Sequence, residues 1–174
     1  VCVTEGVMGL FDGYSRDKGS AAEIANLLNL PVVLVINARA AAYSVAPMLW
    51  GFKHFAQKVK IAGVIFNQVS SASHYAFLKD ACTDAGIEAL GYIPFADELY
   101  IPSRHLGLTL TSKSSMNDVA EKISILIEKY VDIDKLISLC QAVFPCPYTL
   151  PYVSEEGINE VFQRKIRIAV ARDE

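Results

Sequence analysis

The chain has 174 residues, of which 52% are hydrophobic, and a formal net charge of −3. This length suits one domain with a buried core, and the mild acidity without a Lys or Arg run gives no reason to expect nucleic acid as a partner. No apolar run reaches the ~20 residues that span a bilayer, and the four cysteines lack metal-site spacing. We therefore expect a cytoplasmic protein without a membrane partner.

Short apolar runs alternate with helical segments along most of the chain. Strand-like runs cover residues 1–4, 32–36, 61–66 and 88–93, and helical patterns cover 20–29, 40–56, 73–85, 116–130 and 134–143. The run at 32–36 is continuous and β-branched, which is typical of a strand buried on both faces. Strands separated by helices pair in parallel. The sequence therefore predicts an α/β fold, with an open, mostly parallel sheet and helices on both faces.

Four residues give local signals within the predicted helices. Ser20 and Glu23 have the spacing of a capping box, in which each side chain satisfies an amide at the helix start. Gly86 is placed to end the third helix in a C-terminal cap. Pro47 lies inside the long second helix, which tolerates it or kinks there.

The last thirty residues differ from the rest of the chain. A proline-rich connector follows residue 143, and residues 166–170 form an isolated strand-like run. We expect one partial domain over 1–143, a linker over 144–165 and the start of another domain over 166–174. The chain also begins inside a strand-like run. We therefore expect a fragment of a longer protein, with a sheet that is incomplete at its N-terminus.

Polar residues and turn residues follow the predicted strands at their carboxyl ends. Asn37 follows the second strand and Asn67 the third, while Gly91 and Pro94 bracket the end of the fourth. In a parallel sheet the ligand site lies beyond these ends. The pattern indicates a binding site there, although Asn67 can equally serve to satisfy backbone groups at a strand end.

A carboxylate and several glycines follow the first predicted strand. Glu5 supplies a hard oxygen suited to Mg²⁺, and the glycines allow close approach of backbone to a metal or phosphate. Asp12, seven residues further on, could hold a water or a substrate group. From spacing alone, a solvated surface loop is an equal possibility.

An ordered set of motifs runs through roughly the first 110 residues. It comprises EGVMGLFDG at 5–13, GSAAEIA at 19–25, NARA at 37–40, GVIFNQV at 63–69, GYIP at 91–94 and PSRHLGL at 102–108. This set resembles the cobyrinic acid a,c-diamide synthases. The terminal IAVARDE at 168–174 is similar to the start of that family's glutaminase domain.

The resemblance implies a P-loop NTPase fold like that of dethiobiotin synthetase. It also implies a glutamine-dependent, ATP-driven amidoligase that converts the a and c acetate carboxylates of cobyrinic acid to amides in cobalamin biosynthesis. The implied ligands are ATP, Mg²⁺ and a corrinoid or related tetrapyrrole. Glutamine would be processed by a glutaminase domain outside this chain.

Carried over by motif, the resemblance assigns roles to individual residues. Glu5 would bind Mg²⁺ and act in catalysis with Asp12, and Asn67 would hydrogen-bond the nucleotide base. Gly91 and Pro94 would wall the base pocket. On the substrate side stand Arg104, His105 and Asn37, although His105 as a packed loop histidine and Arg104 in an ion pair are the simpler alternatives.

Two departures limit the implied function. Asn37 stands where the family commonly has an acidic residue, and no G-x-x-x-x-G-K-[ST] phosphate loop occurs. The family carries that loop upstream, so we expect this chain to be inactive on its own. Amidation of another tetrapyrrole, such as nickel sirohydrochlorin, is the nearest alternative. A non-catalytic nucleotide-binding module, like the partition and septum-site ATPases, and a binding domain with degenerate loops are the others.

The predicted sheet has a further consequence for association. A parallel sheet without its first strands exposes backbone donors and acceptors along one edge. We therefore expect self-association, with a homodimer as the simplest form.

Overall fold

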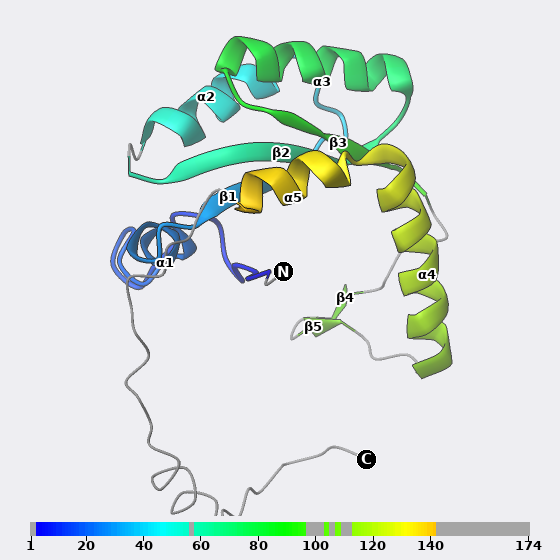
Figure 1. Cartoon of the computed structure of the whole chain (residues 1–174), viewed down its shortest axis with the longest axis horizontal. Coiled ribbons are helices and arrows are strands. Elements are labelled where there is room, and N and C mark those ends of the chain that lie inside the picture. The colour runs from blue at the N-terminus through cyan, green and yellow to red at the C-terminus, as the bar shows by residue number, and fades with distance from the viewer. Residues whose placement is uncertain (1–2, 56–57, 97–102, 105–106, 109–112, 142–174) are drawn as a thin grey trace, which may run out of the picture. The chain divides into compact units, whose positions relative to one another are not determined.

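The computed structural model describes residues 3–55, 58–96, 103–104, 107–108 and 113–141, which belong to one compact unit, Val1–Val143. The elements are α1 (Ala21–Leu27), β1 (Pro31–Asn37), α2 (Val45–Phe55), β2 (Lys60–Val69), α3 (Ala72–Ala85), β3 (Ala89–Pro94), β4 (Ser103–Arg104), β5 (Gly107–Leu108), α4 (Lys113–Tyr130) and α5 (Ile133–Gln141) (Figure 1). The predicted linker at 144–165 and the predicted second domain at 166–174 lie outside the described residues and stay predictions.

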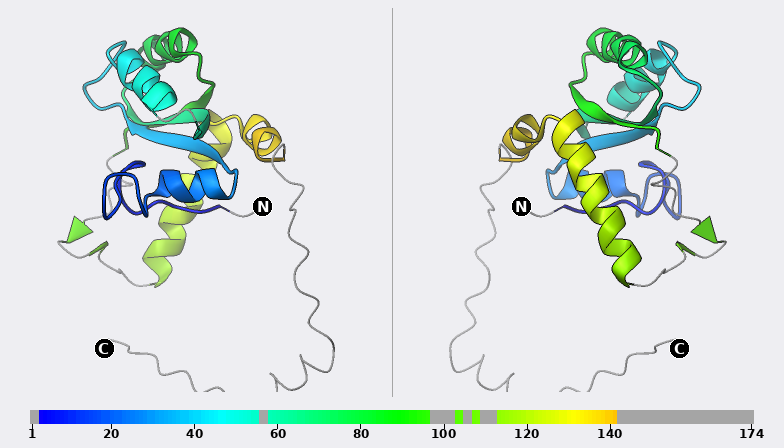
Figure 2. Two further views of the ribbon diagram at one scale, coloured as in Figure 1. Left: turned by 90° about the vertical axis from the view of Figure 1, so that its left-hand side faces the viewer. Right: turned by 90° about the vertical axis from the view of Figure 1, so that its right-hand side faces the viewer.

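The sheet confirms the predicted α/β fold. Its order is β1-β2-β3, and both neighbouring pairs are parallel. Helices α2 and α3 cover one face, while α1 and α5 lie on the other side (Figures 1 and 2). Strands β4 and β5 form a separate antiparallel pair, which the sequence did not predict. No helix among the described residues is long and apolar enough to cross a membrane.

The core lies between the sheet and the layer of α2 and α3. Strand alternation sends every second side chain to this face, so Leu34 and Ile36 of β1 pair in register with Val64 and Phe66 of β2. The fully buried core side chains include Leu49, Val64, Phe66, Leu78 and Cys82. Of the cysteines, Cys82 is therefore a buried free thiol, as expected of an incidental cysteine.

The opposite face of β1 is open, so the prediction of a strand buried on both faces is wrong. Val35 keeps 69% of its surface exposed, although Leu34 and Ile36 on either side are buried. The reason is that α4 and α5, which pack on the sheet from its other side, contact β3. The β-branched composition of the run predicted the strand but not its neighbours.

The first predicted strand, at residues 1–4, is not formed where the structure describes it. Val3 and Thr4 are in no strand, and Val3 is 87% exposed. A strand needs a hydrogen-bonded neighbour, and none of β1 to β5 pairs with these residues. Glu5 therefore does not follow a strand end.

All five predicted helices are found among the described residues, but some begin or end at other residues than predicted. Helix α2 begins at Val45 rather than at residue 40, because Ala40 adopts a left-handed conformation with φ 57°. Pro47 consequently falls in the first turn, where its missing N–H breaks no helical bond and no kink is needed. Gly86 ends α3 in the predicted left-handed cap, with φ 63°. Lys53 of α2 reinforces that end by donating to the Gly86 carbonyl over 2.6 Å.

The capping box at α1 forms in a modified way. Ser20 Oγ accepts from the Glu23 N–H over 3.2 Å, as predicted. The Glu23 carboxylate, however, accepts from the Gly19 N–H over 2.6 Å instead of from the Ser20 N–H. Two amides ahead of the helix are thus satisfied, because the Ser20 N–H donates to the Asp17 carbonyl.

Candidate functional site

Two of the predicted site residues meet at the carboxyl edge of the sheet. Asn37 at the end of β1 pairs in register with Asn67 of β2, and the Ala38 N–H donates to the Asn67 carbonyl over 2.8 Å. Neighbouring strands lie about 4.8 Å apart, so both amide side chains belong to one small area. The structure therefore brings together one residue predicted to bind nucleotide and one predicted to bind substrate.

Both asparagine side chains also serve the backbone of their own strand ends. Asn37 Oδ1 accepts from the Arg39 N–H, and Asn67 Oδ1 accepts from the Gln68 N–H, each over 2.9 Å. These bonds agree with the simpler alternative of strand-end asparagines. They leave the side-chain NH₂ donors of both residues without a protein acceptor within the described part of the chain. The site thus offers donors at its surface.

A β-bulge interrupts β2 at this edge. Phe66 pairs with Tyr92 and Val69 pairs with Pro94, so Asn67 and Gln68 together oppose one residue of β3. Gln68 has φ 59°, which is uncommon for a residue other than glycine. Its Oε1 atom is buried and has no hydrogen-bond partner among the described residues. Strain and an unpaired buried acceptor at one residue are features that concentrate at functional sites.

The loops after the strands are tied together by His74, which the sequence reasoning missed. Its Nδ1 accepts from the Ser70 N–H over 3.2 Å and lies 3.0 Å from Ser70 Oγ. Because Nδ1 is an acceptor here, the proton of the neutral ring is on Nε2, which donates to the Ala41 carbonyl. His74 therefore joins the loop after β1 to the loop after β2. The four-residue spacing of Ser70 and His74 at a helix start was the available signal.

Gly91, predicted to bind nucleotide, makes a close backbone contact away from the two asparagines. It is buried, has φ 137°, and forms an isolated bridge with Val131. A Cβ atom at Gly91 would lie 2.7 Å from the Val131 Cα atom. The close approach of the α4–α5 connection therefore requires glycine here whether or not a ligand binds. Pro94, in contrast, pairs with Val69 at the carboxyl edge.

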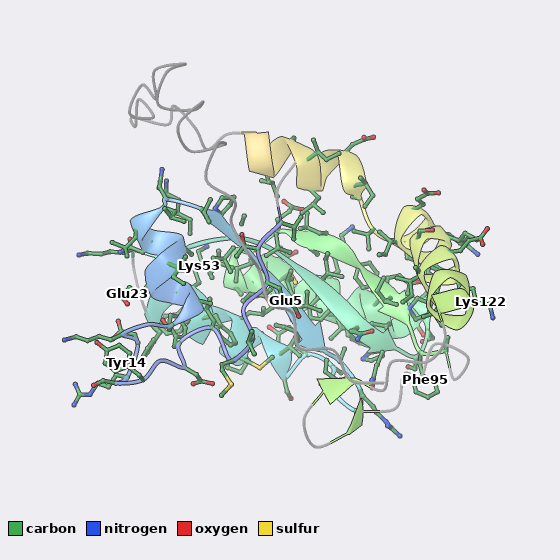
Figure 3. All side chains as sticks on the ribbon, turned by 90° about the horizontal axis from the view of Figure 1, so that it is seen from below. Glu5, Tyr14, Glu23, Lys53, Phe95 and Lys122 are labelled. Carbon is green, nitrogen blue, oxygen red and sulfur yellow. The ribbon has the colours of Figure 1, made fainter. Side chains whose placement is uncertain are left out.

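Glu5 and Asp12 are not brought to the carboxyl edge. The loop that carries them is anchored by Phe11, whose ring lies 6.0 Å from that of Phe52 and 5.0 Å from that of Phe55. Phe55 ends α2 just before β2 begins, so this contact holds the loop toward the amino edge of the sheet. In Figure 3 Glu5 lies over the β1 side of the sheet, apart from Phe95, the residue that follows β3 at the other side. The prediction that Glu5 follows a strand end is wrong, because residues 3 and 4 are in no strand.

Glu5 and Asp12 together supply as many carboxylates as a magnesium site needs. Within the described ranges no group of three or more His, Cys, Asp or Glu side chains gathers. Mg²⁺ needs no such cage, because one or two carboxylates together with phosphates and waters suffice. Glu5 and Asp12 are both exposed. Neither carboxylate forms a hydrogen bond or ion pair with the described residues, so the oxygen atoms of both are available as ligands.

The remaining predicted residues are Arg104 and His105. Arg104 lies in β4 and pairs with Gly107 of β5 through its backbone. Its side chain and the whole of His105 lie outside the described residues. Their predicted roles on the substrate side stay predictions.

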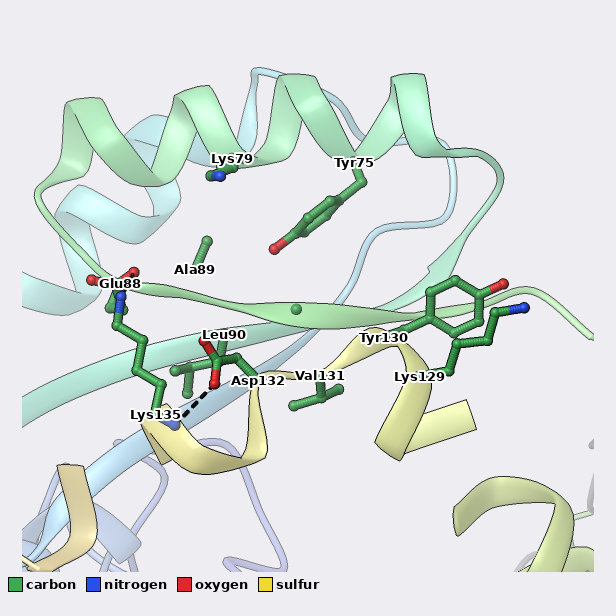
Figure 4. A pocket seen from close by; sticks show the side chains of 11 residues that line it. Tyr75, Lys79, Glu88, Ala89, Leu90, Lys129, Tyr130, Val131, Asp132 and Lys135 are labelled. Atoms are coloured by element: carbon green, nitrogen blue, oxygen red, sulfur yellow. Dashed lines mark hydrogen bonds and ion pairs between the residues drawn. The ribbon is translucent and has the colours of Figure 1, made fainter. Parts of the chain in front are cut away.

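A cavity of about 400 Å³ lies along the outer edge of β3 (Figure 4). Its charged lining residues are Lys79, Glu88, Lys129, Asp132 and Lys135. Lys135 and Glu88 pair at 2.6 Å, and burial raises the pKa of Tyr75, which extends from α3 toward β3. The charges largely balance one another, so this cavity indicates no ligand class of its own.

Comparisons with known proteins agree with the fold. The model of the AAA domain family matches residues 1–103. The hydrogenobyrinate a,c-diamide synthase of Brucella ovis is 38% identical over the whole chain, which covers 39% of that protein. The cobyrinate a,c-diamide synthases of Caldanaerobacter subterraneus and Dehalococcoides mccartyi are 40% and 37% identical over the whole chain, which covers 38% of each. No solved structure matches.

The chain thus spans about two fifths of the length of these curated relatives. The family model matches more than half of the chain, and the relatives align along all of it. This protein belongs to the AAA domain family, and along its length it is similar to a part of the cobyrinate and hydrogenobyrinate a,c-diamide synthases.

Proposed function

We propose that this chain is part of an ATP-driven, glutamine-dependent amidoligase that converts acetate carboxylates of a cobyrinate-type tetrapyrrole to amides. The observation that carries the proposal is identity of 37–42% to a,c-diamide synthases along 99–100% of the chain. In this proposal residues 1–143 belong to the synthetase domain, 144–165 form a linker and 166–174 begin the glutaminase domain. The protein would work in the cytoplasm.

The proposed reaction activates a carboxylate, because a carboxylate is a poor electrophile. One carboxylate oxygen attacks the γ-phosphorus of ATP, and the bond from that phosphorus to the bridging oxygen breaks to release ADP. The lone pair of ammonia then attacks the carbon of the acyl phosphate. The carbon–oxygen bond breaks, phosphate leaves with the former carboxylate oxygen, and a proton passes to solvent. Mg²⁺ supplies neutralising charge to the phosphates when it is bound.

Within this reaction the residues of the carboxyl edge bind rather than react. Asn67 would present its amide to the nucleotide base, with Pro94 near it and Gly91 further back along β3, and Asn37 would donate to the substrate. Placing reactants in contact is itself a large part of such catalysis. The geometry of Asn37 and Asn67 in register supports a shared site for the two ligands. Arg104 and His105 would contact the anionic substrate.

Glu5 and Asp12 would act at the same site only after a rearrangement. The loop that holds them is anchored by Phe11 against α2. Leaving this contact would expose the Phe11 ring, which costs about 2 kcal/mol for a side chain of this size. Binding of ATP and Mg²⁺ can offset such a cost, since Glu5 gains a charge partner.

The test is tetrapyrrole-dependent ATP hydrolysis by the whole synthetase, with glutamine and Mg²⁺. Cobyrinate, hydrogenobyrinate and nickel sirohydrochlorin are compared as substrates. We expect turnover with one of the first two, and Glu5→Gln should lower it on the order of a hundredfold. Glu23→Gln is the matched control, because its amide oxygen still accepts from Gly19, and it should stay within about threefold of wild type. Hydrolysis that needs no tetrapyrrole would refute the proposal.

A further inference from the structure

Arg39 occupies a fixed position beyond the end of β1. Its N–H donates to Asn37 Oδ1 over 2.9 Å. The residue before it, Ala38, is fully buried and bonds to the Asn67 carbonyl. The residue after it, Ala40, has a left-handed backbone with φ 57°. This turn locks the main chain and leaves the Arg39 side chain exposed at the carboxyl edge.

The Arg39 guanidinium reaches across the sheet edge to the residue that follows β3. Its Cζ atom lies 5.8 Å from the centroid of the Phe95 ring, and the Phe95 N–H is held by the Val69 carbonyl over 3.0 Å. Because β2 lies between β1 and β3, the side chain passes in front of the end of β2. Arg39 therefore belongs to the same edge of the sheet as the bulge that contains Gln68.

The contact with the Phe95 ring holds the Arg39 guanidinium in place without occupying its N–H donors. A guanidinium stacks on a ring through its face, and its five N–H donors point outward in its plane. Within the described part of the chain no carboxylate is found paired with Arg39, whereas Lys135 forms an ion pair with Glu88. Arg39 is thus held in place with its donors available.

Gln68 supplies an independent sign that a ligand belongs here. Its Oε1 atom is buried without a partner and its backbone is left-handed. An unpaired buried acceptor and an uncommon conformation both cost free energy, and proteins keep them mainly where function uses them. An anionic ligand group would satisfy Arg39, and a donor of the same ligand would satisfy Gln68 once its side chain turns outward, because Oε1 is buried in this structure.

We propose that Arg39 binds an oxyanion, either a carboxylate or a phosphate, of the ligand held at this edge, with Gln68 accepting from a neighbouring donor of that ligand. Arg39 was not among the residues that the motifs assigned a role. The identity of the ligand rests on the proposed function, in which a tetrapyrrole carries carboxylates and ATP carries phosphates. Binding of an oxyanion at Arg39 does not rest on it.

The first experiment is a titration of the 174-residue chain with inorganic phosphate and, separately, with acetate at constant ionic strength. The side-chain Nε–H signals of the arginines are followed by NMR spectroscopy. We expect a saturable shift at Arg39 with at least one anion and none at Arg16, an exposed arginine in the turn before α1. Equal, unsaturated shifts at both arginines, or none at Arg39, would overturn the proposal.

The second experiment distinguishes the two sources of the oxyanion in the whole synthetase. Loss of a charge-assisted hydrogen bond weakens binding about tenfold or more, so Arg39→Gln should raise one KM by that factor and leave kcat within a few fold. A raised KM for the tetrapyrrole identifies a carboxylate, and a raised KM for ATP identifies a phosphate. Arg39→Lys should recover only part of the loss, because lysine keeps the charge without the planar fork.

Arg16→Gln is the control for the second experiment and should change neither KM. If Arg39→Gln also leaves both KM values within about twofold of wild type, the proposal is wrong. Absence of turnover in the wild type would count against the proposed function, and the anion titration would then decide the role of Arg39 alone.

Discussion

At the scale of single residues, the carboxyl edge has side chains that bond to their own backbone and side chains that are unpaired. Asn37 and Asn67 hydrogen-bond their own backbone through their oxygen atoms. Arg39 and Gln68 keep polar groups that the described residues leave unpaired. The first pair explains how the edge is held in shape, and the second pair explains what it can bind.

Cys82 shows how burial controls the pKa of a side chain. Burial raises the pKa of its thiol from the ordinary 9.0 to about 12, and the negative charge of Glu88 adds to this effect. A pKa that is higher in the folded state means that this contribution to stability is complete below pH 9. It is lost progressively as the pH rises toward 12.

We therefore expect the free energy of unfolding to fall more steeply between pH 9 and pH 12 in the wild type than in Cys82→Ala. Urea denaturation at several pH values measures both slopes. At pH 8, iodoacetamide should alkylate Cys82 far more slowly in the folded chain than in urea, because the thiol is buried and protonated. Equal alkylation rates in the two states would contradict this explanation.

At the scale of elements, two glycines with different surroundings give a matched pair of substitutions. Gly91 in β3 has φ 137° and faces Val131, whereas Gly51 in α2 has no atom within 4 Å of the position of an added Cβ. Gly91→Ala should lower the free energy of unfolding by about 3 kcal/mol through backbone strain and overpacking. Gly51→Ala should raise it by about 0.5–1 kcal/mol, because alanine favours the helix over glycine and an added Cβ meets no atom here.

Urea denaturation of the two glycine variants measures these changes directly. Destabilisation of similar size in both would mean that the α4–α5 connection does not press on β3 as the structure has it. A neutral Gly91→Ala would contradict the bridge between Gly91 and Val131 in particular.

Elements could be predicted from the sequence where one local pattern decides them. The β-branched run ending before Asn37 and the cap at Gly86 needed no knowledge of neighbours, and the structure has a strand and a helix end there. The bulge at Gln68 and the reach of Arg39 to Phe95 depend on contacts between strands far apart in the sequence. The loop with Glu5 was misplaced because its predicted strand had no partner.

At the scale of the whole molecule, β1 is the open edge of the three-stranded sheet. Its outer backbone pairs with no other described strand, and Val35 exposes 69% of its surface on the strand's open face. The strand contains no charged residue. An uncharged, β-branched edge is a favourable template for pairing with another chain.

We expect the isolated chain to self-associate through β1, so its apparent mass in light scattering should rise with concentration. Val35→Lys should shift it toward the monomer, because a charge on an edge strand opposes pairing. Leu27→Lys is the control, since Leu27 is equally exposed at 74% but lies in α1, and it should change little. A wild type that stays monomeric at high concentration would contradict the role of this edge.

In the proposed reaction a carboxylate is activated by phosphorylation. One oxygen atom of that carboxylate should therefore pass to inorganic phosphate, and isotope labelling measures this transfer. The tetrapyrrole is labelled with oxygen-18 in its acetate carboxylates and converted by the whole synthetase with ATP, Mg²⁺ and glutamine. Since phosphate leaves with a former carboxylate oxygen, we expect one oxygen-18 atom in inorganic phosphate for each amide formed. Amide formation with unlabelled phosphate would contradict it.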